Sequence, residues 1–413
     1  MLHKQTKNRA TRRCILGASI LMSSLFVSPS LWAADSLGGA LTEGKPTVNA
    51  RVRLETVAQD NALKDASAQT LRVRAGYQTA PYNGLSVLVE VEGTTGSGDF
   101  NSSANKKTTF SKVIDPSVSD VNRAVVTYQA DKNKVKAGRQ RIKIDNDRFV
   151  GNVGWRQNEQ TFGAAYWENG AMIQDTEIKY AYISNINNIK GKNVGSASNI
   201  LNLGYTGLGA GKLTGYAYMI KLLETNGTQA ADESFNSVGV RFKGAAASGE
   251  SNKLLYTLEY ASQSHMKDVA GADTQSASYT FAEGGYQIKG VATLKGSYEV
   301  LGGDGTYGFQ TPLATKHAFN GWSDQFLSTP TAGLKDTFVT VATKVAGVKL
   351  KVIQHNFATD SGGDGLGSEL DFVAVKKIGK PYKVVLKYAS YTAGDTGSYV
   401  DTNKLWLQGE AKF

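Results

Sequence analysis

Apolar and polar residues alternate in one short segment after another along this chain, and this pattern constrains the fold more than any other feature of the sequence. The segment 47–55, TVNARVRLE, places valine, alanine and leucine at even positions, and asparagine, arginine and glutamate at odd positions. Segments 71–77 and 84–93 repeat the alternation. Because successive residues of a strand point to opposite faces, each segment is predicted to be a strand with one apolar and one polar face.

The alternation predicts about 18 strands, with 16 also possible because pattern alone places strand ends to within about two to four residues. Besides the first three, the predicted strands are 121–129, 134–141, 160–167, 176–184, 199–206, 212–221, 235–243, 253–262, 275–283, 290–300, 336–345, 348–357, 368–377, 382–391 and 403–413. Short connections alternate with long ones, and the long ones are 93–119, 142–159, 185–198, 222–234, 301–335 and 392–402. We therefore predict an all-β, antiparallel up-and-down transmembrane barrel that forms a single domain, with short periplasmic turns and long extracellular loops.

Residues 1–34 have the layout of a secretory signal peptide: a basic stretch, the apolar run CILGASILMSSLFV and then SPSLWAAD. Cleavage after Ala33 or Ala34 is expected to remove Cys14, the only cysteine of the chain. The mature protein 35–413 is then expected to have no disulfide, no cysteine-ligated zinc and no cysteine nucleophile. The leader also carries five of the 46 basic residues, which lowers the net charge from +10 to about +5 and gives no support to nucleic-acid binding.

The main alternative fold is a secreted β-sandwich, β-helix or propeller whose apolar faces turn inward. Many of the 19 tyrosines lie near predicted strand ends, as in the aromatic girdles of membrane barrels. The last eleven residues, NKLWLQGEAKF, resemble the closing strand of outer-membrane barrels, whose terminal aromatic residue, here Phe413, is the membrane-insertion signal. We therefore predict an integral protein of the outer membrane of a Gram-negative bacterium. Its expected partners are outer-membrane lipid, lipopolysaccharide and the barrel-insertion machinery, and a monomer is favoured over an oligomer.

No residue pattern points strongly to catalysis, a metal or a nucleotide. The segment 302–308, GGDGTYG, has the glycine spacing of a dinucleotide loop, but no predicted helix follows it to bind a pyrophosphate. His265, His317 and His355 lack metal-ligand spacing, and the acidic segment 360–369 is better explained as a solvated loop than as a calcium site. We expect a protein that is not an enzyme and that has no catalytic residue, metal or cofactor.

If the apolar faces meet lipid, the polar faces line a lumen that is wide enough for water. The basic residues predicted to line this pore are Arg51, Arg53, Arg72, Arg74, Arg123, Arg139, Arg141 and Arg241. An excess of basic groups in the lumen favours anions. The alternative is that these arginines pair with glutamates across neighbouring strands and only brace the wall.

Mixed charge is densest in the stretch 138–162. On a barrel, its central part is an extracellular loop too polar to lie against lipid, so we predict that it folds inward and narrows the pore. The loop residues predicted to form this constriction are Asp145, Asp147, Arg148, Arg156 and Glu159. We expect Arg148 or Arg156 to pair with one of the three acids. Whether the loop 301–335 also enters the pore is left open by the sequence.

The same stretch carries the motifs GRQR, RFVG, GWRQN and QTF, and residues 302–336 carry TPLAT, HAFNGW and TP. With these motifs and its C-terminal strand, the chain resembles the alginate-export family of outer-membrane barrels. The resemblance implies an 18-stranded barrel and a selective channel lined with basic groups. Two functions follow: passive diffusion of small hydrophilic, preferably anionic, solutes, or export of an anionic polysaccharide such as alginate.

Overall fold

The computed structural model describes residues 33–223, 234–265 and 275–413. The predicted signal peptide, residues 1–34, therefore lies outside the described residues except for Ala33 and Ala34. A short helix, α1 (Leu37–Thr42), precedes the first strand. Within the described ranges, no helix is both long and apolar enough to cross a membrane.

Nearly all the remaining regular structure is antiparallel strand. The strands are β1 (Lys45–Gln59), β2 (Ala66–Gln78), β3 (Leu85–Asp99), β4 (Val118–Ala130), β5 (Asn133–Gln140), β6 (Thr161–Asn169), β7 (Thr176–Asn187), β8 (Asn193–Tyr205), β9 (Gly211–Ile220), β10 (Leu222–Leu223), β11 (Phe235–Ser248), β12 (Asn252–His265), β13 (Ser276–Ile288), β14 (Ala292–Leu301), β15 (Leu334–Val345), β16 (Val348–Ala358), β17 (Gly365–Ile378), β18 (Tyr382–Ala393) and β19 (Thr402–Lys412). Because β9 and β10 both pair with β8 on either side of Lys221, they form one interrupted strand. The described residues thus build eighteen strands, as the alternation predicted.

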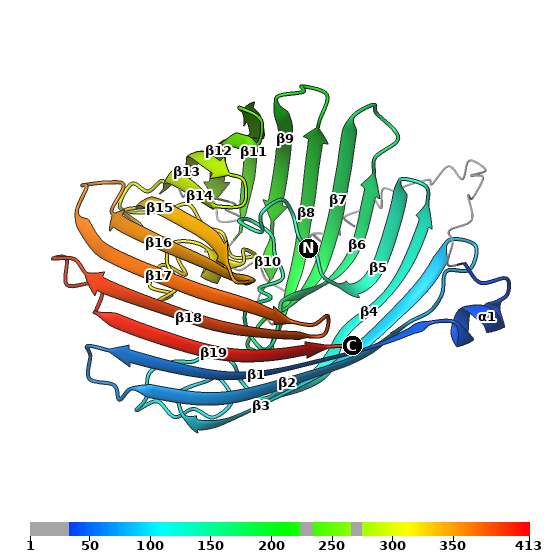
Figure 1. Ribbon diagram of the computed structural model, residues 1–413, viewed down its shortest axis with the longest axis horizontal. Coiled ribbons are helices and arrows are strands. Elements are labelled where there is room, and N and C mark those ends of the chain that lie inside the picture. The colour runs from blue at the N-terminus through cyan, green and yellow to red at the C-terminus, as the bar shows by residue number, and fades with distance from the viewer. Residues whose placement is uncertain (1–32, 224–233, 266–274) are drawn as a thin grey trace, which may run out of the picture.

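The sheet closes on itself through its first and last strands. β1 pairs with β2 on one side and with β19 on the other, where Val52 lies opposite Gly409. Closure leaves no sheet edge running the length of the barrel, which the lipid interior requires. Figure 1 shows the curved wall and the ends of β1 and β19 side by side.

The wall is polar inside and apolar outside. Arg53 is fully buried, whereas the next residue, Leu54, is 45% exposed and points to the outer face. Val52, Val87 and Leu258 are likewise exposed. A soluble sandwich would bury these side chains, so the exposed apolar face is the physical sign of a lipid-facing wall.

Two of the long connections enter the lumen instead of extending outward. The first inward loop, residues 141–160, joins β5 to β6, and the second inward loop, residues 302–333, joins β14 to β15. Phe149 of the first loop and Phe309 of the second have ring centroids 5.8 Å apart, and both rings pack on Tyr279 of β13. The two loops therefore share one aromatic core with the barrel wall, and this core positions the polar residues described next.

Candidate functional site in the lumen

Two arginines of neighbouring strands lie directly opposite each other inside the barrel. Arg51 of β1 pairs in register with Arg72 of β2. Both side chains lie on the polar faces that the alternation turns away from lipid, and Arg51 is 8% and Arg72 1% exposed. Like charges that face each other across strands repel, so this pair depends on acceptors from elsewhere.

The acceptors within reach are incomplete. Arg51 Nη1 donates to the backbone oxygen of Trp155 at 3.1 Å, and Arg51 Nη2 lies 3.4 Å from Glu410 Oε2. Arg72 Nη2 donates to Asn49 Oδ1. Among the described residues, the Nε atoms of both arginines and Nη1 of Arg72 have no hydrogen-bond partner. A bound anion would satisfy these donors, which are costly to leave unpaired in a buried site.

A second group of charges is internally paired. Arg53 Nη1 lies 3.1 Å from Asp115 Oδ2, and Arg156 Nη1 lies 3.2 Å from Glu55 Oε1. Arg156 Nη2 lies 2.8 Å from Asp324 Oδ2, so Arg156 joins the first inward loop to the second as well as to β1. These side chains are all buried. Each charge of this group has a counter-ion, so the group holds the loops in place and contributes little to the electrostatic potential in the lumen.

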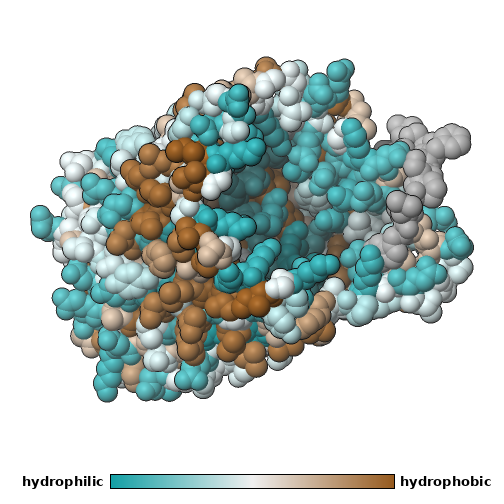
Figure 2. Space-filling view, viewed as in Figure 1, coloured by the Kyte–Doolittle hydropathy of each residue, from teal (hydrophilic) through white to brown (hydrophobic). Residues whose placement is uncertain are grey.

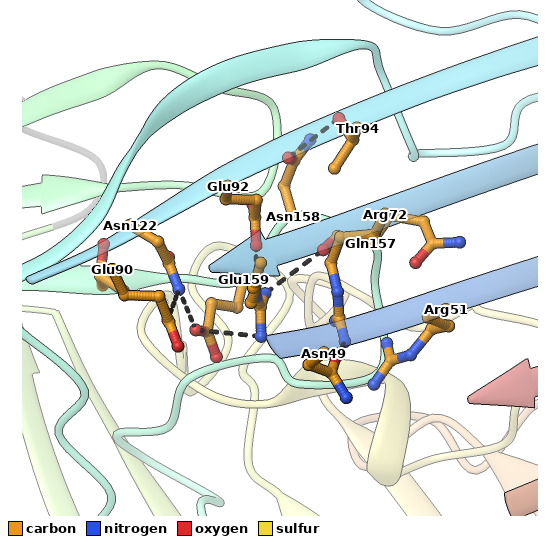
Figure 3. A network of polar contacts seen from close by, with 12 residues as sticks. Asn49, Arg51, Arg72, Glu90, Glu92, Thr94, Asn122, Gln157, Asn158 and Glu159 are labelled. Atoms are coloured by element: carbon orange, nitrogen blue, oxygen red, sulfur yellow. Dashed lines mark hydrogen bonds and ion pairs between the residues drawn. The ribbon is translucent and has the colours of Figure 1, made fainter. Parts of the chain in front are cut away.

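Glu159, at the end of the first inward loop, is the centre of a third group (Figure 3). Its carboxylate lies 3.2 Å from Arg74 Nη1 and accepts hydrogen bonds from Arg141 Nε at 2.7 Å and Asn122 Nδ2 at 2.6 Å. Burial alone would raise the pKa of Glu159, but Arg74 and Arg141 lower it to about 2. Glu159 is therefore ionised throughout the physiological pH range and neutralises part of the positive charge of Arg74 and Arg141.

The pairing predicted for Arg148 and Arg156 within the first inward loop is wrong for both residues. Arg148 Nε lies 2.7 Å from Glu299 Oε1 on β14, and Arg156 pairs with Glu55 and Asp324. None of these acids belongs to the loop itself. The prediction considered only partners that are close in sequence, whereas folding inward brings the loop against distant strands.

Two of the acids expected to pair with these arginines have other partners. Asp145 Oδ2 accepts a hydrogen bond from Asn202 Nδ2 at 2.8 Å, and Asp147 Oδ2 lies 2.9 Å from Lys143 Nζ. Burial raises the pKa of Asp147 above its usual value, although Lys143 opposes the shift. Of the three acids, only Glu159 belongs to an arginine network.

The two inward loops are joined by an aromatic and charged contact that the sequence did not predict. Trp155 of the first loop stacks on His317 of the second, with ring centroids 5.1 Å apart and 9° between planes. Lys387 Nζ of β18 lies 2.6 Å from His317 Nε2, and 4.3 and 3.7 Å from the ring centroids of Trp155 and Trp322. The motifs GWRQN and HAFNGW contain both tryptophans and the histidine, but only the fold reveals that they meet at Lys387.

The Nδ1 atom of His317 also lies 2.6 Å from Asp324 Oδ1. Burial and the nearby Lys387 charge lower the pKa of His317 well below its usual value, against the opposing effect of Asp324. Burial would raise the pKa of Asp324, but His317, Lys404 and Arg156 hold it well below its usual range. The pair is thus a neutral imidazole that donates from Nδ1 to an ionised carboxylate and accepts from Lys387 at Nε2.

Comparison with known proteins identifies the family. Residues 48–300 match the family model described as alginate export, which is more than half of the chain. The chain belongs to the alginate export family. No curated protein matches the sequence.

The fold of this family member is similar to solved outer-membrane porins. OccAB2 of Acinetobacter baumannii superposes with a TM-score of 0.69 at 14% identity, covering 89% of this chain and 98% of that one. OccK11 (OpdR) of Pseudomonas aeruginosa superposes with a TM-score of 0.68 at 12% identity, covering 94% of this chain and 100% of that one. OpdK of P. aeruginosa, solved with vanillate, superposes with a TM-score of 0.66 at 12% identity, covering 89% of this chain and 99% of that one. Together with the family match, the closed barrel places this protein in the Gram-negative outer membrane as an integral β-barrel.

A cavity of about 1200 Å³ opens inside this barrel near the short turns. Its wall carries the cations Arg123, Lys134, Lys136 and Arg141, and the acids Asp35 and Asp131. Figure 2 shows a hollow in this face of the molecule whose visible wall is largely hydrophilic. We call this cavity the periplasmic vestibule, because it lies beside the turns 79–84 and 131–132, which are predicted to face the periplasm, at the same end of the barrel as Phe413.

The remaining residues named from the sequence lie apart from the central arginines. Arg241 lies opposite Glu259 in register, at 3.5 Å, on the wall formed by β11 and β12. Arg139 lies at the top of β5, 2.7 Å from Asp120. Phe413 follows β19, and its backbone exchanges hydrogen bonds with Val48 while its side chain is exposed. Among the described residues, no group of three or more histidine, cysteine, aspartate or glutamate side chains is arranged to hold a metal ion.

Proposed function

We propose that this protein is a passive diffusion channel for small hydrophilic anions, with carboxylates as the preferred solutes. The observation that carries the proposal is the opposed pair Arg51 and Arg72, which is buried in the lumen with three nitrogens that no acceptor among the described residues satisfies. Guanidinium groups bind carboxylates through directed N–H donors, so this pair is suited to a transient anion site.

The periplasmic vestibule supports the same proposal. Four cations against two acids line this cavity, and an excess of one charge in a low-dielectric channel raises the local concentration of the opposite ion. Glu159 pairs with Arg74, and Glu90 pairs with Arg123, so these acids reduce the positive electrostatic potential along the same wall. A conducting channel requires this balance, since an anion that binds too tightly does not leave. The vanillate found with OpdK is itself a carboxylate, in line with this solute class.

Export of an anionic polysaccharide is the alternative that the family description suggests. A continuous polymer would have to pass the two inward loops, which are joined to each other and to the wall by buried ion pairs such as Arg148 with Glu299. The structural neighbours are porins, which favours diffusion over export.

The test is the zero-current potential of the purified protein in a planar bilayer across a tenfold gradient of potassium chloride. The proposal predicts a potential whose sign corresponds to anion preference, and a lower conductance when chloride is replaced by a small carboxylate that competes for the arginines. A cation-selective potential or a silent membrane would refute it. Block by oligomeric alginate from the periplasmic side, without carboxylate flux, would favour the exporter.

A further inference from the structure

Charge is segregated around the extracellular rim of the barrel. The loops 60–65, 359–364 and 394–401 present one exposed lysine, Lys64, against five exposed acids, which are Asp60, Asp65, Asp364, Asp395 and Asp401. The loops 100–117 and 188–192 instead present exposed lysines, which are Lys106, Lys107, Lys112, Lys190 and Lys192. We call these five lysines the basic rim. The rim is therefore acidic from β16 round to β2 and basic from β3 to β8.

The two loops of the basic rim meet. Ser103 Oγ lies 3.5 Å from the backbone oxygen of Lys190. Gly191, with a φ of +71°, packs so closely on Val118 that an added Cβ would come within 2.6 Å of its side chain. These contacts bring lysines from two separate hairpins onto one surface. Of the five, only Lys107 has a carboxylate partner among the described residues, Asp99 at 3.1 Å.

The wall beneath the basic rim is unusually low. β5 has 8 residues and β6 has 9, whereas β1 and β3 have 15 each. A strand of 8 residues at 3.4 Å per residue and a tilt near 45° rises about 19 Å, which is less than the roughly 25 Å height of an apolar band. Polar groups therefore enter the level of the outer leaflet on this side.

The top of this low wall is polar. β4 pairs with β5 only from Ala124 downward, so residues 118–123 pair with β3 alone. Arg139 lies in the resulting notch, where it contacts Asp120 at 2.7 Å and Thr161 Oγ1 at 2.9 Å. Below the notch the outward side chains are apolar again, with Val126 and Val135 both exposed.

We propose that the basic rim and the notch beneath it form a binding site for the phosphorylated headgroup of an outer-leaflet glycolipid. The lysines of the two loops bind the phosphates, and the acyl chains lie along the apolar outer face of β4 and β5. Within the described ranges, only this side of the barrel combines several lysines that lack a carboxylate partner with a lowered apolar band. The acidic loops on the other side repel the same headgroup.

The site follows from charge complementarity. Lysine ammonium groups are point charges that bind phosphate oxygens, and basic residues at a membrane surface each add to the affinity for anionic lipid. Headgroup phosphates of the outer leaflet lie at the level where the loops leave the bilayer. This site lies on the outside of the barrel, so the inference does not depend on what passes through the lumen.

The test measures binding of diphosphoryl lipid A to the full-length mature barrel in detergent micelles, by native mass spectrometry and by displacement of a fluorescent lipid A. The variant K106Q/K112Q/K190Q/K192Q removes the four lysines without a carboxylate partner. The control K132Q/K289Q/K377Q/K380Q removes the same charge from the periplasmic end. Heat-dependent migration in gels confirms that each barrel is folded.

The proposal predicts that the rim variant loses at least about tenfold in affinity for diphosphoryl lipid A and that the control does not. Wild-type protein should also bind dephosphorylated lipid A at least about tenfold more weakly. Equal loss in both variants, or equal binding of both lipids, would overturn the proposal. Displacement of lipid A by millimolar inorganic phosphate would also overturn it, because the lysines would then form a site for free phosphate.

Discussion

Arg51 and Arg72 face each other across β1 and β2 in the interior of the barrel, and neither has a full set of acceptors. Carboxylate partners are present for most of the arginines in this group: Arg53 pairs with Asp115, Arg74 pairs with Glu92 and Glu159, and Arg51 itself lies 3.4 Å from Glu410 Oε2. Among the described residues, Arg72 has no carboxylate partner, so the uncompensated positive charge of this group lies at the Arg72 side of the opposed pair. This position is therefore the anion site that we propose.

Replacement of Glu159 by glutamine should destabilise the protein strongly. The change leaves Arg74 and Arg141 facing a neutral amide in a buried site, and breaking such a pair costs about 3 kcal/mol. Urea unfolding of the refolded barrel in micelles, followed by tryptophan fluorescence, measures the loss. Glu177→Gln is the control, because Glu177 is partly exposed and pairs with Lys179 and Lys212. If the urea unfolding midpoint of Glu159→Gln matches that of the control, the Glu159 network contributes little to the stability of the folded protein.

Acidification from pH 7 to pH 5 should weaken the contact between the inward loops. The pKa of His317 is lowered in the folded protein, so the unfolded chain takes up a proton near its ordinary value of 6.5 and the folded chain does not. Stability is therefore present above that pH and lost as the pH falls. His317→Gln removes the titrating group, and its unfolding midpoint should depend less on pH across this window. Parallel pH profiles for wild type and variant would contradict the assignment.

Replacement of Arg148 by alanine should loosen the first inward loop and raise channel noise. Arg148 and Glu299 form a buried pair, so either single change leaves an unpaired buried charge. The double variant R148A/E299A removes both charges and should recover part of the lost stability. A double-mutant cycle on unfolding free energies tests this, and a coupling energy near zero would show that the two side chains act independently.

Phe413→Ala should reduce assembly into the outer membrane and have little effect on folding in detergent. The contacts between Phe413 and Val48 run through the backbone and survive the change, whereas the exposed aromatic ring is lost. The measurement compares heat-dependent gel migration of protein from outer-membrane fractions with that of protein refolded in micelles. Equal yields in membranes would contradict the predicted insertion signal.

Much of the fold was predictable from the sequence because each strand carries its own two-sided pattern. The alternation in 47–55 placed Arg51 and Arg53 on the face opposite Val52, and the structure has this arrangement. The folding of the first loop into the lumen followed from its charge. These inferences succeed because they depend on local periodicity and on the cost of polar groups in lipid.

Partners that meet only through tertiary structure were not predictable. Arg148 and Glu299 are separated by 151 positions in the sequence, and Lys387 and His317 are separated by 70 positions. Nothing in the local sequence links these residues, because barrel closure and loop packing bring them together. The same limit applies to Arg51 and Arg72: their lumen-facing position was predicted, but which of their nitrogens lack an acceptor among the described residues is known only from the packed structure.

The most direct test of the central claim compares ion selectivity in R51Q/R72Q with wild type and with K289Q/K380Q, which removes the same charge from exposed short turns. Zero-current potentials across a tenfold potassium chloride gradient give the permeability ratio for each protein. The proposal predicts that R51Q/R72Q loses most of the anion preference while the control retains it. Unchanged anion preference in R51Q/R72Q would contradict the assignment of the opposed arginines as the anion site.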